Sequence, residues 1–168
     1  MDDRLTGAGS TGVELREVIE DDLLVLFAHQ QDPEATAMAA FPARERDAFL
    51  AHWTKILADE RVAKRTILVD GVVAGNIVSF TQEGEREVGY WIGREYWGRG
   101  VATAALRAFL DDNATRPLVA HVAEHNVASR RVLENCGFAV VGDGIPILSE
   151  NGKTVREIRL RLDRAGSG

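Results

Sequence analysis

The sequence predicts one mixed α/β domain over residues 13–162, and three observations support this fold class. Stretches with the period-two alternation of strands are interspersed with stretches of helical periodicity. Neither an internal repeat nor a linker interrupts residues 13–162. The length of 168 residues, with 45% hydrophobic and 27% charged residues, is that of an ordinary single globular domain.

The two ends of the chain differ from this domain in composition. Residues 1–12 (MDDRLTGAGSTG) and 163–168 (DRAGSG) are small, polar and rich in glycine. Segments of this kind bury little apolar surface, so both ends are predicted to be mobile tails.

The first part of the domain is predicted to hold a strand and two helices. Residues 13–19 (VELREVI) alternate apolar and polar side chains and predict a strand. Residues 20–31 (EDDLLVLFAHQQ) begin with three acids, which suit a helix N-terminus, and continue as an apolar run. Residues 43–59 predict a second helix, whose apolar side chains recur at spacings of three and four: Phe49, Trp53, Ile56 and Leu57.

Three strands are expected next. Residues 65–80 contain two β-branched runs separated by Asp70-Gly71, a dipeptide typical of hairpin turns. Residues 86–92 (REVGYWI) form the third strand, after the turn-like residues 82–85. The remaining predicted elements are a helix after Gly100, a strand over 117–123, a helix over 128–136 that ends at Gly137, and strands over 138–148 and 155–162 joined by a turn at 150–153.

Composition and charge exclude several classes of function. The formal net charge of −6 argues against a nucleic-acid-binding protein. Cys136 is the only cysteine, so neither an intrachain disulfide nor a cysteine metal cluster is possible, and no metal site is expected. The chain starts with acidic residues and has no apolar run long enough to span a bilayer. We therefore expect a cytoplasmic protein without membrane contact.

Residues 96–106 (YWGRGVATAAL) carry the first chemical signal, because they open a helix on bare backbone. The first N–H groups of a helix have no partner within it, and its dipole places partial positive charge there. Gly98 and Gly100 leave that end uncovered, which favours binding of an anion such as a phosphate. The alternative is a tight turn into an ordinary helix.

Two common phosphate-binding patterns fit this segment poorly. A Walker loop requires Lys and Ser or Thr after its second glycine, but Arg99 and Gly100 follow Gly98. A dinucleotide-binding fold requires a third glycine where Thr103 stands, and a glycine turn directly after the strand. Here residues 93–97 intervene, and no second set of alternating strands and helices exists for the other half of the cofactor.

Residues 90–106 and 125–138 together resemble the GNAT superfamily of N-acetyltransferases, and most closely its Rim-type branch, which acetylates protein N-termini and small amines. In that family a Gln/Arg-x-x-Gly-x-Gly/Ala turn binds the pyrophosphate of acetyl-CoA. Gly100 and Ala102 match that turn, whereas Trp97 stands where the family prefers Gln or Arg. Asn126, followed by Gly137-Phe138, matches the second cofactor segment of the family.

This resemblance implies a mixed, twisted sheet of about six to seven strands with helices on both faces. Acetyl-CoA is then the co-substrate, held in a V-shaped opening between the strands near Ile92 and Val122. The implied cofactor-binding residues are Tyr90, Trp91, Ile92, Gly98, Arg99, Gly100, Val101, Ala102, Thr103 and Asn126. The strand residues are expected to act through the main chain, which includes polarising the thioester carbonyl. Each of these residues also has a structural alternative. The strand side chains would pack in the core, Arg99 would be an exposed loop arginine, and Asn126 would be a helix N-cap.

The implied catalytic residues are Ser129 and Glu87. Many family members protonate the departing thiolate with a tyrosine, but Leu133 stands at that position, which leaves Ser129 as the expected proton donor. An amine must lose a proton to attack the thioester, so a base is required. Glu87 is the expected base, and His121 and Glu124 are its rivals.

The implied activity is transfer of an acetyl group to a primary amine, of a small molecule or a protein N-terminus, by direct attack on the thioester. The alternatives are another acyl-CoA on the same fold and a non-catalytic acyl-CoA-binding or regulatory domain. The residues that select the acceptor are expected in residues 32–49 and in the final hairpin. Phe41, Trp53 and Phe80 either line an apolar acceptor pocket or pack in the core. Dimers are frequent in this family, so a homodimer is a further expectation to test.

Overall fold

The computed structural model of the chain describes residues 12–41, 43–143, 147–148 and 154–163. Residues 1–11 and 164–168, which make up most of the two predicted tails, lie outside the described residues. The turn predicted at 150–153 lies outside them as well.

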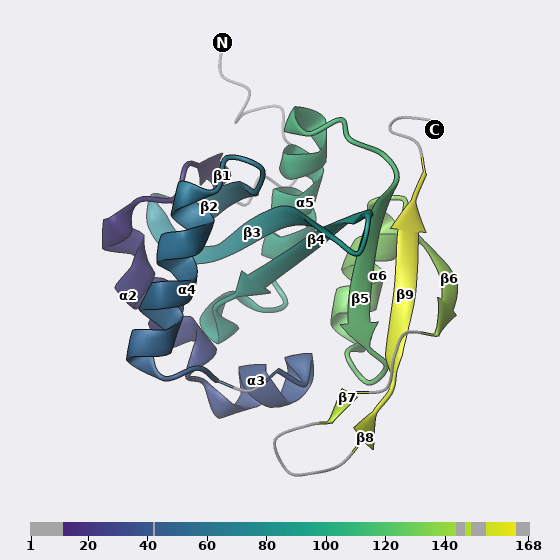
Figure 1. Cartoon of the computed structure of the whole chain (residues 1–168), viewed down its shortest axis with the longest axis horizontal. Helices are drawn as coiled ribbons and strands as arrows, with labels where there is room; N and C mark the ends of the chain where they lie inside the picture. The colour runs from purple at the N-terminus through teal and green to yellow at the C-terminus, as the bar shows by residue number, and fades with distance from the viewer. Residues whose placement is uncertain (1–11, 42, 144–146, 149–153, 164–168) are drawn as a thin grey trace.

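A mixed seven-stranded sheet is the centre of the domain, in the order β1-β2-β3-β4-β5-β9-β6 (Figure 1). Every neighbouring pair is antiparallel except β4 and β5, which run parallel. The predicted fold class is therefore confirmed. The bounds of the strands in sheet order are β1 Val13–Arg16, β2 Ala63–Val69, β3 Val72–Gln82, β4 Glu85–Ile92, β5 Leu118–Ala123, β9 Glu157–Leu162 and β6 Ala139–Asp143.

Helices cover both faces of this sheet, as predicted. Helices α5 (Val101–Asp112) and α6 (Val127–Asn135) lie behind it in Figure 1, and α5 buries Val101, Ala105, Leu106 and Phe109 in the larger core. Helices α2 (Leu23–Gln30) and α4 (Arg46–Ala58) lie in front and bury Leu26, Phe49 and Trp53 in a second core. Among the described residues, no helix combines the length and apolar character that crossing a membrane requires.

The N-terminal elements are shorter than predicted. The first strand ends at Arg16 rather than at residue 19, and the acids of the following segment form a 3-10 turn, η1 (Glu20–Asp22), before α2 begins. A short helix, α3 (Pro33–Ala39), occupies residues expected to form a loop. Asp32 caps it by accepting the Glu34 N–H at 3.2 Å, and Pro33 fits its first turn.

The prediction of two continuous strands at the end of the domain is wrong. Residues 138–148 form β6 and a separate strand β7 (Ile147–Leu148), and residues 155–162 divide between β8 (Thr154–Val155) and β9. Strands β7 and β8 form their own two-stranded sheet. The physical reason is that β5 ends at Ala123, opposite Glu157, so residues before Glu157 have no β5 partner and pair with β7.

A buried carboxylate connects β1, η1 and β2. Asp22 is 3% exposed and accepts two hydrogen bonds from Arg16, at 2.8 Å each, one from the Ile19 N–H at 3.0 Å and one from Thr66 Oγ1 at 2.7 Å. Burial by itself would raise the pKa of Asp22, but these hydrogen bonds outweigh it and hold the pKa below its usual value. The ionised form therefore stabilises the fold.

We predict that Asp22→Asn lowers the free energy of unfolding by about 2 kcal/mol at neutral pH, because charged hydrogen bonds of that order are lost. The pKa of Asp22 is lower in the folded than in the unfolded state. Its contribution is therefore complete above the unfolded pKa of about 3.9 and disappears as the pH falls through the folded value.

Urea unfolding of parent and variant at about pH 7 and about pH 3 measures this difference. Asp21→Asn is the matched control, because Asp21 is an exposed acid of the same turn. A difference between parent and Asp22→Asn that does not decrease at the lower pH would contradict the prediction.

Candidate active site

The sheet opens where its two parallel strands meet. Strands β4 and β5 share a single register pair, Glu87 with Val119, although β4 continues to Ile92 and β5 to Ala123. Figure 1 shows the two strands diverging beyond that point. The main chain of residues 90–92 consequently faces β5 without pairing to it, which produces the opening predicted near Ile92 and Val122.

A pocket of about 390 Å³ lies at this opening. Its lining includes Ser129 and every predicted cofactor-binding residue except Arg99: Tyr90, Trp91, Ile92, Gly98, Gly100, Val101, Ala102, Thr103 and Asn126. Arg99 instead lies over the ring of Tyr96, with its guanidinium carbon 5.3 Å from the ring centre. Residues about 40 positions apart in the sequence are therefore brought to one concave site.

The start of α5 has the features of an anion site. Gly98 and Gly100 have φ angles of 72° and 75°, a conformation that glycine adopts without steric cost. Gly100 is the N-cap and contributes no side chain, and the first turn of the helix holds no acidic residue. The N–H groups of residues 101–103 have no acceptor within the helix, so they are available to a phosphate in the pocket.

Trp97 has a structural role at the position where the resembled family prefers Gln or Arg. Its indole N–H donates to the carbonyl oxygen of Ile92 at 3.0 Å. The bond fastens the glycine turn to the last residue of β4. The turn is therefore held in place by an aromatic side chain.

Helix α6 presents Ser129 to the same pocket. Asn126 caps this helix by accepting the Ser129 N–H at 3.2 Å, so the N-cap interpretation of Asn126 is correct, and its position in the lining is compatible with a second role. The Ser129 hydroxyl lies 2.7 Å from the hydroxyl of Tyr90. Leu133 is 1% exposed and packs in the core, where it has no access to the pocket.

Tyr90 contributes a side-chain contact that the sequence did not predict. Its hydroxyl reaches α6 from β4, and burial raises the pKa of this phenol to about 12. The hydroxyl is therefore neutral at any ordinary pH. The alternating pattern of a strand indicates which face of the sheet a side chain lies on. It does not indicate that the Tyr90 hydroxyl contacts a serine 39 positions later in the sequence.

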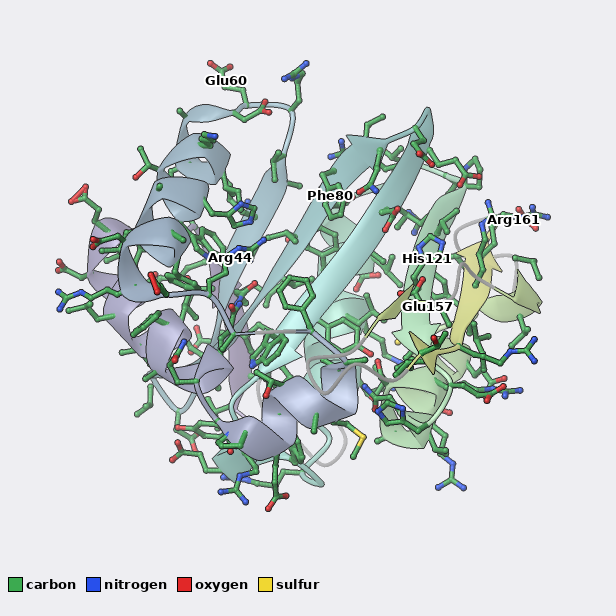
Figure 2. All side chains as sticks on the ribbon, turned by 60° about the horizontal axis from the view of Figure 1, so that its bottom comes forward. Arg44, Glu60, Phe80, His121, Glu157 and Arg161 are labelled. Atoms are coloured by element: carbon green, nitrogen blue, oxygen red, sulfur yellow. The ribbon has the colours of Figure 1, made fainter. Side chains whose placement is uncertain are left out.

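The expected base and one of its rivals lie together on the opposite face of the sheet from Tyr90. Glu87 Oε2 is 3.3 Å from His121 Nδ1. Glu157, on β9, adds a third titratable group that the sequence analysis missed (Figure 2). Burial raises the pKa of Glu157; the negative charge of Glu87 raises it further, and His121 lowers it. Glu124 is exposed, and its side chain has no hydrogen bond among the described residues.

Helix α3 borders the pocket with Ala35, Met38 and Ala39. Three contacts, made by Arg94 and His125, hold it. Arg94 pairs with Asp32 at 2.6 Å and with Glu34 at 3.0 Å, and His125 Nε2 lies 2.9 Å from the carbonyl oxygen of Ala37. The expectation that residues 32–49 cover the site is compatible with this placement.

The three aromatic residues considered for an acceptor pocket have different surroundings. Trp53 is buried beside Phe49 and packs in the core. Phe41 is exposed and meets the ring of Trp91 edge to face, with centroids 6.3 Å apart. Phe80 lines a second hollow, of about 970 Å³, that shares no lining residue with the first.

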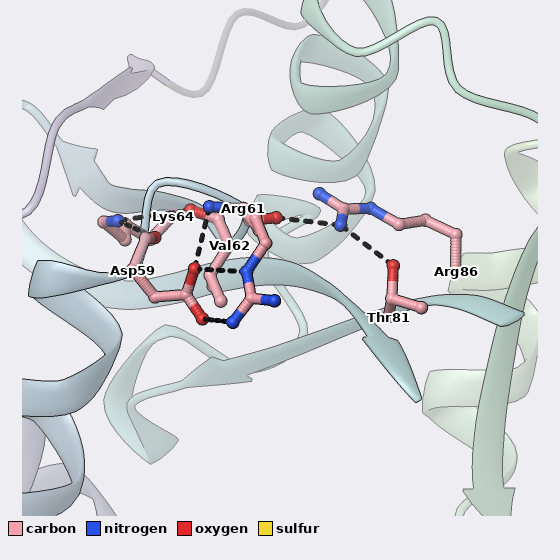
Figure 3. A network of polar contacts seen from close by, with 6 residues as sticks. All are labelled: Asp59, Arg61, Val62, Lys64, Thr81 and Arg86. Carbon is pink, nitrogen blue, oxygen red and sulfur yellow. Dashed lines mark hydrogen bonds and ion pairs between the residues drawn. The ribbon is translucent and has the colours of Figure 1, made fainter. Parts of the chain in front are cut away.

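A polar network borders this second hollow (Figure 3). Arg61 pairs with Asp59, and Arg86 donates to the carbonyl oxygen of Arg61 at 2.8 Å. These contacts connect the end of α4 to the hairpin between β3 and β4. The network has a structural explanation and brings no catalytic group toward the first pocket.

An open parallel strand pair with a glycine-started helix beside it is the arrangement that the resemblance to the acetyltransferases implied. Residues 13–139 match the family model described as the acetyltransferase (GNAT) domain. The chain therefore belongs to the GNAT acetyltransferase family, and the predicted family membership is confirmed. Among the described residues, no group of three or more His, Cys, Asp or Glu side chains is arranged to hold a metal ion.

One curated relative is YdaF of Bacillus subtilis (strain 168), whose name provisionally calls it a ribosomal N-acetyltransferase. It is 31% identical over 115 residues, which span 64% of this chain and 62% of that protein. The aligned part thus falls short of two thirds of the relative's length.

Several solved structures share the fold. RimL, a ribosomal L7/L12 α-N-protein acetyltransferase in complex with coenzyme A, has a TM-score of 0.80 at 18% identity, covering 92% of this chain and 96% of its own. A spermidine N-acetyltransferase from Vibrio cholerae, in complex with CoA and spermine, has a TM-score of 0.77 at 18% identity, with 91% and 96% covered. Mycobacterium smegmatis RimJ has a TM-score of 0.72 at 23% identity, with 90% and 81% covered.

Proposed function

We propose that this protein is an acetyl-CoA-dependent N-acetyltransferase that acts on a primary amine of a small molecule or a protein N-terminus. One observation carries the proposal. The pocket at the open β4–β5 pair is lined both by the bare start of α5 and by Ser129. The first feature suits a phosphate, and the second offers a hydroxyl that can serve as a proton donor in the same pocket. The names of the relatives, which include ribosomal and spermidine N-acetyltransferases, support the same reading.

The lining residues fit acetyl-CoA without further assumptions. The N–H groups at the start of α5 suit its pyrophosphate, and the main chain of residues 90–92, which has no β5 partner, suits the amide groups of its pantetheine arm. Arg131, on α6, adds a cation to the lining. When bound, acetyl-CoA supplies an activated acetyl group as a thioester.

The chemistry requires one proton to leave nitrogen and one to reach sulfur. The amine nitrogen bonds to the acetyl carbon while the carbon–sulfur bond breaks, and sulfur keeps the electron pair. We assign proton removal to Glu87, with His121 as its hydrogen-bond partner, and proton donation to Ser129. The assigned residues lie on opposite faces of the sheet, which keeps the base apart from the donor.

Acetyl-CoA binding is the first prediction. At about 100 times its dissociation constant, acetyl-CoA should stabilise the fold by about 2.7 kcal/mol and raise Tm by about 5 to 11 °C. Gly100→Glu should abolish this shift, because it puts a side chain and a negative charge at the phosphate position.

Differential scanning fluorimetry measures the shift. Gly71→Glu is the matched control, since Gly71 also has a positive φ, 83°, but lies in the hairpin between β2 and β3. It should lower stability and retain the shift. If saturating acetyl-CoA does not raise the Tm of the parent, the proposed function is wrong. If Gly100→Glu retains the shift, the phosphate does not bind at the start of α5.

Loss of the proton donor is the second prediction. Ser129→Ala should lower kcat by about 10- to 1,000-fold, the lower part of and just below the roughly 100- to 10,000-fold that general-acid catalysis typically contributes, and should change KM for acetyl-CoA less. The cap of α6 should survive, because Asn126 accepts from the backbone N–H of residue 129. Release of the CoA thiol, followed with a thiol reagent against a panel of amines, measures both constants. An unchanged kcat would exclude Ser129 as the proton donor.

Loss of the base is the third prediction. Glu87→Gln keeps the shape and removes the basicity, so the variant should bind acetyl-CoA normally and turn over slowly at about pH 7. It should recover partly at about pH 9, because more of the acceptor amine is then free of its proton. pH–rate profiles of the parent and the variant test this.

Glu14→Gln is the matched control for the base, since Glu14 is an exposed glutamate on β1, at the edge of the sheet. It should keep the parent's profile. Should Glu87→Gln keep that profile too, Glu87 is excluded. His121→Asn, Glu124→Gln and Glu157→Gln, measured in the same way, would then identify which of these groups is the base. Thermal stabilisation without thiol release for any amine would instead indicate a binding or regulatory domain.

A further inference from the structure

The contact between Tyr90 and Ser129 crosses the opening between the two parallel strands. Tyr90 belongs to β4, on one side, and Ser129 belongs to α6, which follows β5 on the other. Their hydroxyl oxygens are 2.7 Å apart, and both residues line the pocket. The bond therefore lies at the place where the thioester is expected under the proposed function.

The distances indicate which hydroxyl donates. The phenol has one proton and two acceptors within reach, Ser129 Oγ at 2.7 Å and the Ser129 carbonyl oxygen at 3.3 Å. The shorter distance is typical of an O–H···O hydrogen bond, and the longer one is beyond the usual range for it. A phenol is also the more acidic hydroxyl of the pair. We therefore take Tyr90 as the donor and Ser129 Oγ as the acceptor.

This direction has a consequence for the serine proton. Once Ser129 Oγ accepts from Tyr90, the proton of Ser129 cannot point back along the same bond. Among the described residues, the Ser129 hydroxyl has no second hydrogen-bond partner, so its proton is available to an acceptor in the pocket. Burial raises the pKa of Tyr90 to about 12, so the phenol keeps its proton and this arrangement persists at every ordinary pH.

We infer that Tyr90 is a positioning residue, which donates to Ser129 Oγ and thereby directs the serine proton toward the thioester sulfur. This inference rests on the proposed function. As the carbon–sulfur bond breaks and sulfur takes the electron pair, Ser129 passes its proton to sulfur. The more acidic Tyr90, which is hydrogen-bonded to Ser129 Oγ, returns a proton to the serine and regains one from solvent. Many family members have a tyrosine at the position of Leu133. Here a tyrosine on β4, Tyr90, acts instead, through Ser129.

A packing role for Tyr90 makes different predictions. The ring packs against the larger core, so its removal would lower stability whatever the hydroxyl does. Tyr90→Phe keeps the ring and removes only the hydroxyl. A loss of kcat that depends on the presence of Ser129 follows from positioning, and packing does not produce it.

The test is a double-mutant cycle of parent, Tyr90→Phe, Ser129→Ala and the double variant. Release of the CoA thiol gives kcat and KM. For variants that turn over slowly, the same reaction is followed with enzyme in excess over substrate, and the thermal shift with acetyl-CoA measures cofactor binding. Tyr90→Phe is expected to lower kcat about tenfold, the effect of one hydrogen bond, with KM for acetyl-CoA little changed. The double variant should have the kcat of Ser129→Ala, because Tyr90 then has no serine to direct.

Thr66→Val is the control for loss of a buried hydroxyl, since Thr66 donates to Asp22 on the far side of the sheet from Tyr90. It should lower Tm and leave kcat unchanged. Unchanged kcat in Tyr90→Phe, or the same tenfold loss in the Ser129→Ala background, would overturn the inference. Failure of the proposed function is separately visible, as a parent protein that releases no thiol with any amine, and it overturns both.

Discussion

The parallel pairing of β4 with β5 is the constraint on which the candidate site depends. Parallel neighbours need a crossover connection, and here that connection contains η2 (Arg94–Tyr96), the glycine turn and α5. Only η2 and the glycine turn separate β4 from α5, and Trp97 bonds that turn to Ile92, so the N-terminus of α5 lies beside the end of β4. Because the strands share only the pair Glu87 and Val119, their main chains separate at the same end. One topological feature therefore creates both the candidate anion site and the strand edge without a partner.

Separated strands need contacts that hold the opening at a defined width, and side chains from distant elements provide them. The hydrogen bond between Tyr90 and Ser129 joins β4 to α6, and Trp97 fixes the glycine turn to β4. Helix α3 is held from both sides, by Arg94 before the turn and by His125 before α6. Each contact links two elements that border the pocket, so the pocket's shape is set by side chains as well as by the strands.

The alternation of side chains along β4 separates two kinds of chemistry. Val88, Tyr90 and Ile92 face the core with α5 and α6, whereas Glu87 faces the other side, where His121 and Glu157 also lie. A neutral phenol and a serine therefore occupy one face, and the ionisable cluster occupies the other. An acceptor amine that approaches from the second face would reach this ionisable cluster, in keeping with the role proposed for Glu87.

Local signals in the sequence determined the hairpin at Asp70-Gly71, the glycine turn before α5, the capping of α6 by Asn126 and the family, because each depends on residues close together in the chain. Other features depend on which strands become neighbours. Period-two alternation assigns a side chain to a face, but it does not state the partner across the sheet. Only the tertiary structure placed β9 beside β5, and so brought Glu157 to Glu87 and His121 and divided the last predicted strands. For the same reason the Tyr90 hydroxyl, a core candidate from the sequence, met Ser129 only once β4 and α6 were packed together.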